Sequence, residues 1–238
     1  MTASIETTEF VIRTIAQTAV DNEKYFGDLD AVVGDGDFGY SLARGFEQVL
    51  AKWSEFDRTD AGTLVLRVAT TITSRIGGTS GPIWGTAFLR VGTTIKGGES
   101  VTPTDVVAGL RAAIEGIKKR GNSDVGDKTL LDALVPATDA FEAAIAAGDD
   151  PAGALRSMAV AARAAAEATT GMQARRGRAS YTGERSIGSP DAGAVALAVI
   201  AEKLADEWPA RTGGTTAGAS IPSAADPITQ HDDVERTR

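Results

Sequence analysis

Apolar residues recur along most of the chain with the spacing of amphipathic helices. Leu42, Phe46, Val49 and Trp53 fall on one face of a helix, and six apolar residues between positions 106 and 117 repeat the pattern. A basic turn follows this second run, and Gly121 closes it. The pattern predicts eight helices, over about 5–24, 42–53, 60–74, 82–96, 104–121, 128–146, 151–169 and 190–208.

Capping signals support several of these helices. Thr104 is a candidate cap for the fifth helix, while Asp150-Pro151 and Ser189-Pro190 are typical helix starts. Strand signals are nearly absent, since the best alternating stretch, residues 31–33, is shorter than an ordinary strand. We therefore expect one all-α domain over residues 1–211. The segment 212–238 is rich in Gly, Ser, Thr and Pro and is predicted to be a disordered tail.

Composition narrows the chemistry. The chain is 42% hydrophobic but has no long uncharged apolar run, so we expect a cytoplasmic globular protein without a membrane span. A net charge of -8 argues against nucleic acid as a partner, because phosphate backbones are bound by basic surfaces. There is no cysteine, and the only histidine, His231, lies in the predicted tail. Histidine-based catalysis and cysteine- or histidine-ligated metals are thereby excluded from the predicted domain.

The motif GDGDFG formally matches a dinucleotide-binding fingerprint. That function is disfavoured, because Asp35 and Asp37 would face the pyrophosphate and the strands of such a fold are missing. A calcium-binding EF-hand loop also fails, since Gly39 and Phe46 stand where oxygen ligands are required. The spacing of Asp30 with the two loop aspartates favours a magnesium site. The alternative is a solvated turn whose aspartates cap the next helix.

Two further loops carry candidate chemistry. GGTSGP, residues 77–82, places small residues and two hydroxyls before a helix, where free N–H groups can hold phosphate. QARRGRASY, residues 173–181, is a basic stretch in an acidic protein. Each taken alone is also compatible with an ordinary turn or surface loop. Together with the aspartates they supply the groups that phosphoryl transfer requires.

Four stretches of this sequence resemble the nucleotide-binding L subunit of dihydroxyacetone kinases. They are LDAVVGDGDFG, IGGTSGPIWGTAFLR, RGNSDVGDKTLLDALVPA and MQARRGRASYTGERSIGSPDAGA, spread from Leu29 to Ala194. The resemblance implies a closed antiparallel barrel of eight helices that holds ADP or ATP at one end through two Mg²⁺ ions. It implies Asp30, Asp35 and Asp37 as metal ligands and Arg178 as the catalytic residue. The nucleotide contacts that it implies are Phe38, Gly39, Tyr40, Ser41, Thr79, Ser80, Gly121, Leu130, Arg178, Asp191, Ala192 and Gly193.

The chain departs from the family at two points near these contacts. Phe38 stands where relatives commonly carry His or Thr, and Tyr40-Ser41 replaces a more usual Asn-Met. Both departures concern fine specificity, because the metal ligands are intact. The family's ketose-binding domain, which holds its substrate through a histidine, is absent. No motif indicates the desolvated lysine that a Schiff base would need instead.

The expected function is that of a kinase subunit. It would transfer phosphate from Mg-bound ATP to dihydroxyacetone or a tetrulose, held on a separate ketose-binding subunit, within a homodimer or hetero-oligomer. The nucleotide would be free ATP, or bound ADP recharged by a phosphotransferase-system phosphocarrier. Two other classes of function remain open. One is a regulatory subunit that holds ADP or ATP and signals to a protein partner; the other is a lipid carrier.

Overall fold

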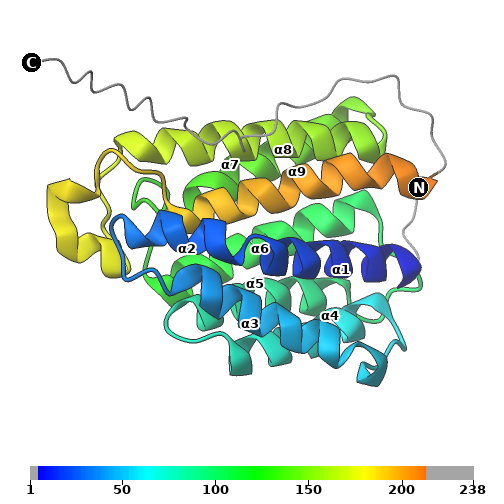
Figure 1. Ribbon diagram of the computed structural model, residues 1–238. Coiled ribbons are helices and arrows are strands. Elements are labelled where there is room, and N and C mark those ends of the chain that lie inside the picture. The colour runs from blue at the N-terminus through cyan, green and yellow to red at the C-terminus, as the bar shows by residue number, and fades with distance from the viewer. Residues whose placement is uncertain (1–4, 213–238) are drawn as a thin grey trace, which may run out of the picture.

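The structure is a computed structural model that describes residues 5–212, and all helices and strands assigned in this part of the chain are helices, without a β-strand (Figure 1). The predicted all-α class is therefore confirmed. The α-helices are α1 (Ile5–Asp21), α2 (Glu23–Ala31), α3 (Phe38–Ala51), α4 (Ala61–Arg75), α5 (Ser80–Ile95), α6 (Pro103–Gly121), α7 (Leu131–Ala147), α8 (Pro151–Ala168) and α9 (Ala192–Thr212). Three short 3₁₀ segments accompany them, at Trp53–Glu55, Thr169–Gly171 and Arg178–Ser186. None of the described helices is long and apolar enough to cross a bilayer.

The long helices pack in chain order, and the last returns to the first. α1 packs on α3, each helix from α3 to α9 packs on the next, and α9 packs on α1, while α2 lies against α3 and α9. The rings of Phe10 in α1 and Trp208 in α9 meet edge to face, with centroids 6.0 Å apart.

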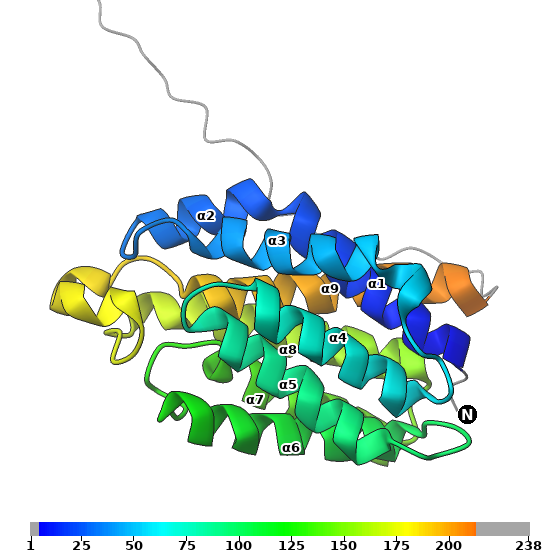
Figure 2. The same cartoon turned by 90° about the horizontal axis from the view of Figure 1, so that it is seen from below.

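The turns between the helices gather at two opposite ends of the molecule (Figures 1 and 2). One end, here called the cleft end, carries the connections 32–37, 76–79 and 122–130 together with residues 172–190. The other, here called the distal end, carries the connections that precede α4, α6 and α8. α3, α5, α7 and α9 therefore begin at the cleft end.

The two halves of the core are built from side chains of different size. Phe46, Leu64, Val68 and Ile72 are fully buried where α3 and α4 pack together. The α7–α9 side is filled mainly by alanine, namely Ala133, Ala137, Ala159, Ala162, Ala166, Ala194 and Ala198. Small side chains let these three helices approach closely, and each buried methylene-sized group contributes about 0.8 kcal/mol to folding.

Glycines bring α4 and α5 into near contact and so fix the loop between them. A Cβ on Gly85 would lie 2.0 Å from Oγ1 of Thr73, and a Cβ on Gly81 would lie 2.2 Å from the carbonyl oxygen of Ile76. The carbonyl beside Gly81 is backbone and cannot yield, and at Gly85 the Cβ and the Cα of Thr73 lie close behind its Oγ1, so larger residues are excluded at both positions. The loop that carries Thr79 is thus delivered by a tightly packed helical hairpin.

Several helix boundaries differ from the sequence predictions. α2 was not expected as a separate helix, because its nine residues are too few and too polar to show a helical period. α3 begins at Phe38 rather than Leu42, so the GDGDFG motif overlaps its first turn. Because α2 extends to Ala31, Asp30 lies in the last turn of this helix instead of in a loop.

The caps of α6 and α9 also differ. Thr102, not Thr104, caps α6, and it forms a reciprocal capping box with Asp105. The end of α6 is closed by Asn122 in the left-handed conformation, at φ 46°, rather than by Gly121. α9 begins after Asp191 and continues past the expected end near 208 to Thr212. The predicted tail, residues 212–238, lies outside the described residues except for Thr212.

Candidate phosphate-binding cleft

A cleft of about 460 Å³ opens at the cleft end, within the size range of small-ligand sites. Six segments line it: the end of α2 with the aspartate loop, the 77–80 loop, the end of α6, the start of α7, the stretch 176–179 and the start of α9. All four sequence stretches that carried the resemblance therefore meet at one site. They do so because helices that alternate in direction return every second connection to the same end.

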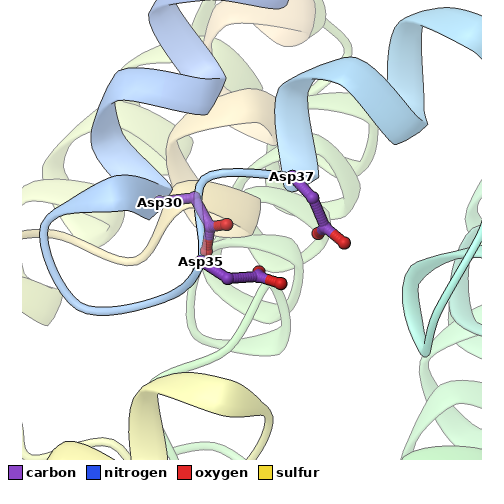
Figure 3. A group of neighbouring side chains, drawn as sticks. All are labelled: Asp30, Asp35 and Asp37. Atoms are coloured by element: carbon purple, nitrogen blue, oxygen red, sulfur yellow. The ribbon is translucent and has the colours of Figure 1, made fainter.

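The three aspartates predicted as metal ligands converge on one side of this cleft (Figure 3). Carboxylate oxygens of Asp30, Asp35 and Asp37 lie within 4.8 Å of one another. Asp30 comes from α2, whereas Asp37 is the N-cap of α3. The loop between them wraps so closely around Asp30 that a Cβ on Gly34 would lie 2.3 Å from its Oδ1. This close approach explains why glycine occupies position 34.

The donor set fits a divalent cation. Three carboxylates at this spacing repel one another unless positive charge compensates them, and Mg²⁺ prefers oxygen ligands. In the structure the guanidinium of Arg178 ion-pairs with Asp35 and lies 3.3 Å from Asp37. Arg178 therefore reaches the place where cation and phosphate charge would meet, as expected for a residue acting on phosphate.

The helix N-termini around the cleft are open to an anion. Asp37, Thr79 and Leu130 are the N-caps of α3, α5 and α7, and none of them caps its helix through its side chain. Such ends present the positive end of the helix dipole. The first N–H of α3, on Phe38, donates to Oδ2 of Asp30, and the first N–H of α7, on Leu131, donates to Oγ1 of Thr129. The 77–80 loop leads into one of these helix starts, and the backbone phosphate site that its sequence predicts there stays a prediction.

Lys128 is a functional candidate that the sequence reasoning missed. Its side chain lines the cleft yet is only 2% exposed, and burial lowers the pKa of its ammonium group. The chain therefore contains a desolvated lysine, although no sequence motif indicates one. The Nζ atom nevertheless donates to three backbone carbonyls, which favours the protonated form rather than the neutral amine of a Schiff base. A lysine within GDKT carries no sequence signal for burial.

Asp191 closes the cleft on the α9 side. Its carboxylate accepts a hydrogen bond from the backbone N–H of Ala194 at 2.8 Å and so caps α9. Burial raises the pKa of Asp191 to about 7, and the nearby carboxylate of Asp132 acts in the same direction. With a pKa of about 7, the Asp191 carboxyl is present in both its protonated and its ionised form near neutral pH.

Most of the residues implied by the resemblance line the cleft. Those that do are Asp30, Asp35, Asp37, Phe38, Thr79, Ser80, Gly121, Leu130, Arg178, Asp191, Ala192 and Gly193. Three others lie outside its lining. Gly39 packs against α2, Tyr40 is 58% exposed beside Arg44, and the Ser41 N–H bonds Asp37 within α3. Arg120 and Arg176 also line the cleft, although the sequence reasoning named neither as a nucleotide contact.

Comparison with known proteins places the fold and this cleft in a family. The sequence matches the DAK2 domain family over residues 32–206, well over half of the chain. The chain belongs to the DAK2 domain family. The match covers every segment of the cleft except Leu29 and Asp30.

Individual relatives are kinases or their subunits. The chain is 35% identical over 182 residues to the ADP-binding subunit DhaL of the PEP-dependent dihydroxyacetone kinase of Escherichia coli (strain K12), covering 76% of this chain and 87% of that protein. It is 37% identical over 199 residues to the L-erythrulose 1-kinase of Mycolicibacterium smegmatis, covering 82% of this chain but 34% of that protein. Its fold matches the dihydroxyacetone kinase of C. freundii in complex with AMP-PNP and Mg²⁺, with a TM-score of 0.68 and 25% identity, over 87% of this chain and 35% of that one.

Proposed function

We propose that this chain is the nucleotide-binding, phosphoryl-donating subunit of a dihydroxyacetone-type kinase. The observation that carries the proposal is the convergence of three carboxylates, uncapped helix N-termini and Arg178 on a single cleft. Phosphoryl transfer needs charge neutralisation and positioning more than covalent chemistry, and these are the groups that provide both. The DhaL relative, described as an ADP-binding subunit, supports the same assignment.

Each group has a distinct role in this proposal. Asp30, Asp35 and Asp37 would hold two Mg²⁺ ions, which supply positive charge to the phosphates when bound. The N-termini of α3 and α5 orient the phosphates through backbone N–H groups. Arg178 donates hydrogen bonds to the transferring group, where its planar guanidinium stabilises charge that develops in the transition state.

The proposed acceptor is a short-chain ketose bound to another subunit. Residues 5–212 contain no histidine that could hold a ketose covalently, and the buried lysine is occupied by carbonyls. Relatives that act on dihydroxyacetone and erythrulose support dihydroxyacetone or a tetrulose as the substrate. Because the chain has a net charge of -8, we infer that the partner presents a comparatively basic face.

We further propose that the eight long helices, α1 and α3 to α9, form one closed antiparallel barrel with α2 as an external brace. The return of the packing order from α9 to α1 supports this arrangement. A closed ring would hold the helix ends around the cleft in a fixed relation, which limits the reorganisation needed when nucleotide binds.

The proposal is tested in two stages with the purified chain. Calorimetry should give ADP binding in Mg²⁺ and little binding in excess chelator, because phosphate alone would face three aspartates. The chain is then mixed with ATP, dihydroxyacetone and a ketose-binding subunit, without phosphotransferase proteins. Turnover in this mixture assigns free ATP as the donor, whereas turnover only after adding a phosphocarrier and its phosphoryl source assigns recharging of bound ADP.

Two outcomes would contradict the proposal. Phosphorylation of dihydroxyacetone by this chain alone would require a ketose site within the chain. Tight Mg-dependent nucleotide binding without turnover under either condition would instead favour a regulatory subunit that holds ADP or ATP.

A further inference from the structure

Lys128 is the most deeply buried cation lining the cleft. It lies in the 122–130 connection with a left-handed backbone, at φ 59°, which is unusual for a residue with a side chain. Burying an ammonium group is costly unless each of its protons finds an acceptor. A lysine that satisfies this condition with carbonyls rather than carboxylates is suited to hold backbone in place.

The acceptors of Lys128 all belong to one segment. We call residues 172–190 the arginine segment, since they contain four arginines, Arg178 among them. Nζ of Lys128 donates to the carbonyl oxygens of Met172 at 3.1 Å and Ser189 at 2.7 Å, and also to that of Ser186. Met172 begins the segment, while Ser186 and Ser189 lie near its end. One ammonium group therefore ties the two ends of the segment together.

The residue before Lys128 adds contacts to the same segment. The carbonyl oxygen of Asp127 accepts a hydrogen bond from the N–H of Arg175 at 3.0 Å, and its carboxylate lies 3.3 Å from Nε of Arg176. Within the segment, Oγ of Ser186 accepts from the N–H of Ala174 at 2.9 Å and donates to the carbonyl of Gly183. The segment is thus closed by polar contacts rather than by an apolar core.

The turn that presents Lys128 is itself anchored to α7. The buried carboxylate of Asp132 accepts hydrogen bonds from the N–H groups of Gly126 at 2.5 Å and Thr129 at 2.7 Å. A continuous path of hydrogen bonds therefore runs from the first turn of α7 through Lys128 to the arginine segment. Only one side chain on this path, that of Lys128, contacts both ends of the segment.

We infer that Lys128 is a positioning residue that holds the arginine segment closed and so keeps Arg178 over the aspartates of the cleft. The effect on turnover rests on the proposed function, whereas the effect on the segment does not. Lys128 touches no reacting group, because its three protons are already donated to backbone. Its influence on phosphate would act entirely through the position of Arg178.

The variant Lys128→Met tests this inference, because it keeps the length of the side chain and removes its donors. Lys118→Met is the matched control, since Lys118 bonds the same connection through Asp124 at 2.9 Å but not the arginine segment. Hydrogen exchange should be about tenfold faster or more in residues 172–190 of Lys128→Met and unchanged there in the control. Protection equal to that of the control variant would overturn the inference.

Turnover with the ketose-binding subunit provides a readout that simple destabilisation would not give. If Lys128 acts through Arg178, its replacement should lower kcat in the wild-type background and have no further effect beside Arg178→Ala. If the fall in kcat of the double variant equalled the product of the two single falls, Lys128 would not act through Arg178. If the wild-type chain shows no turnover at all, the proposed function has failed, and the exchange experiment still decides the role of Lys128.

Lys128→Met could fail to fold, and Ser186→Ala then tests the same closure from the other side. It removes the hydroxyl that bridges Ala174 and Gly183 and leaves the carbonyl partner of Lys128 in place. We expect faster exchange in residues 172–190 and a smaller fall in kcat. Exchange as slow as in wild type would overturn the idea that closure of the segment depends on these polar contacts.

Discussion

The helix N-termini at the two ends of the molecule differ in whether the N-cap side chain accepts a hydrogen bond from the helix. At the distal end the N-caps Asp60, Thr102 and Asp150 each accept a hydrogen bond from the backbone N–H three residues later. At the cleft end the N-caps of α3, α5 and α7 form no such bond. A capped terminus satisfies its own donors, whereas an uncapped one leaves them for solvent or a ligand. The start of α9 is the exception at the cleft end, because Asp191 accepts a hydrogen bond from the N–H of Ala194. Under the proposed function, the distal caps serve stability and the three cleft-end helix starts without a side-chain cap serve binding.

The largest expected effect comes from the aspartates that stand before the uncapped start of α3. Asp35→Asn should weaken Mg-dependent ADP binding by about 100-fold or more, because a neutral amide is a poor ligand for a hard cation. Isothermal calorimetry in Mg²⁺ measures this. Asp28→Asn is the matched control, since Asp28 is exposed on α2 and pairs only with Lys24 among the described contacts. Equal affinity in the two variants would contradict the metal site.

Arg178→Ala should slow phosphoryl transfer by about 100-fold while weakening ADP binding less, if the arginine contact strengthens in the transition state. Steady-state kinetics with the ketose-binding subunit, compared with calorimetry of ADP, separates the two effects. Arg185→Ala removes an exposed arginine of the same segment that does not line the cleft, and should behave as wild type. Equal losses of transfer and binding would reduce Arg178 to a binding residue.

The caps of α9 and α4 should respond to pH in opposite directions. The pKa of Asp191 is raised to about 7 by burial, so the folded state retains a proton that the unfolded state loses near pH 4. Stability should therefore fall as pH rises from about 4 to 7, by at most about 1.4 kcal/mol per pH unit. Asp191→Asn should flatten this decline in urea denaturation at pH 5 and pH 7.5. An unchanged slope would mean that Asp191 is ionised throughout.

Asp60 provides the opposite case at the distal end. Hydrogen bonds from Thr63 lower the pKa of Asp60, so this cap stabilises the fold at neutral pH. The contribution is present above the unfolded pKa and is lost as pH falls through the lower folded pKa. Asp60→Asn should therefore narrow the stability difference between pH 7 and pH 3.

The smallest effects are expected from replacing one threonine N-cap at each end of the molecule. The two replacements should change different quantities, stability at the distal end and ADP affinity at the cleft end. Thr102→Ala removes the capping box of α6 and should lower the free energy of unfolding by about 1 kcal/mol without changing ADP affinity. Thr79 is exposed at the start of α5 and caps nothing, so Thr79→Ala should keep stability and weaken ADP binding. Thermal denaturation and calorimetry on both variants test this. A reversed pattern would refute the division between the two ends.

Long amphipathic helices were predictable because their apolar period repeats over several turns. The helices α4 and α6 lie within one or two residues of the ranges that this pattern predicts. α2 was not predictable, because its nine residues are held by packing against α3 and α9 rather than by their own pattern. Helix starts were also displaced, since either of two neighbouring threonines, Thr102 or Thr104, could have capped α6.

The site was predictable where its chemistry is local in sequence. Asp35 and Asp37 stand two residues apart, and the hydroxyls and glycines of the 77–80 loop are adjacent. The contribution of Lys128 was not predictable, because its partners lie 44 to 61 residues away and are backbone carbonyls that no residue type reveals. Gly39, Tyr40 and Ser41, expected beside the nucleotide, lie outside the cleft lining.

The contact between Phe10 and Trp208 has a practical consequence for labelling and fusion. α9 leaves the cleft at Ala192, and a helix of 21 residues spans about 30 Å. A fluorophore attached beside Phe10 or Trp208 would therefore lie about one helix length from the cleft. It could report tumbling or complex formation by fluorescence anisotropy without obstructing the cleft.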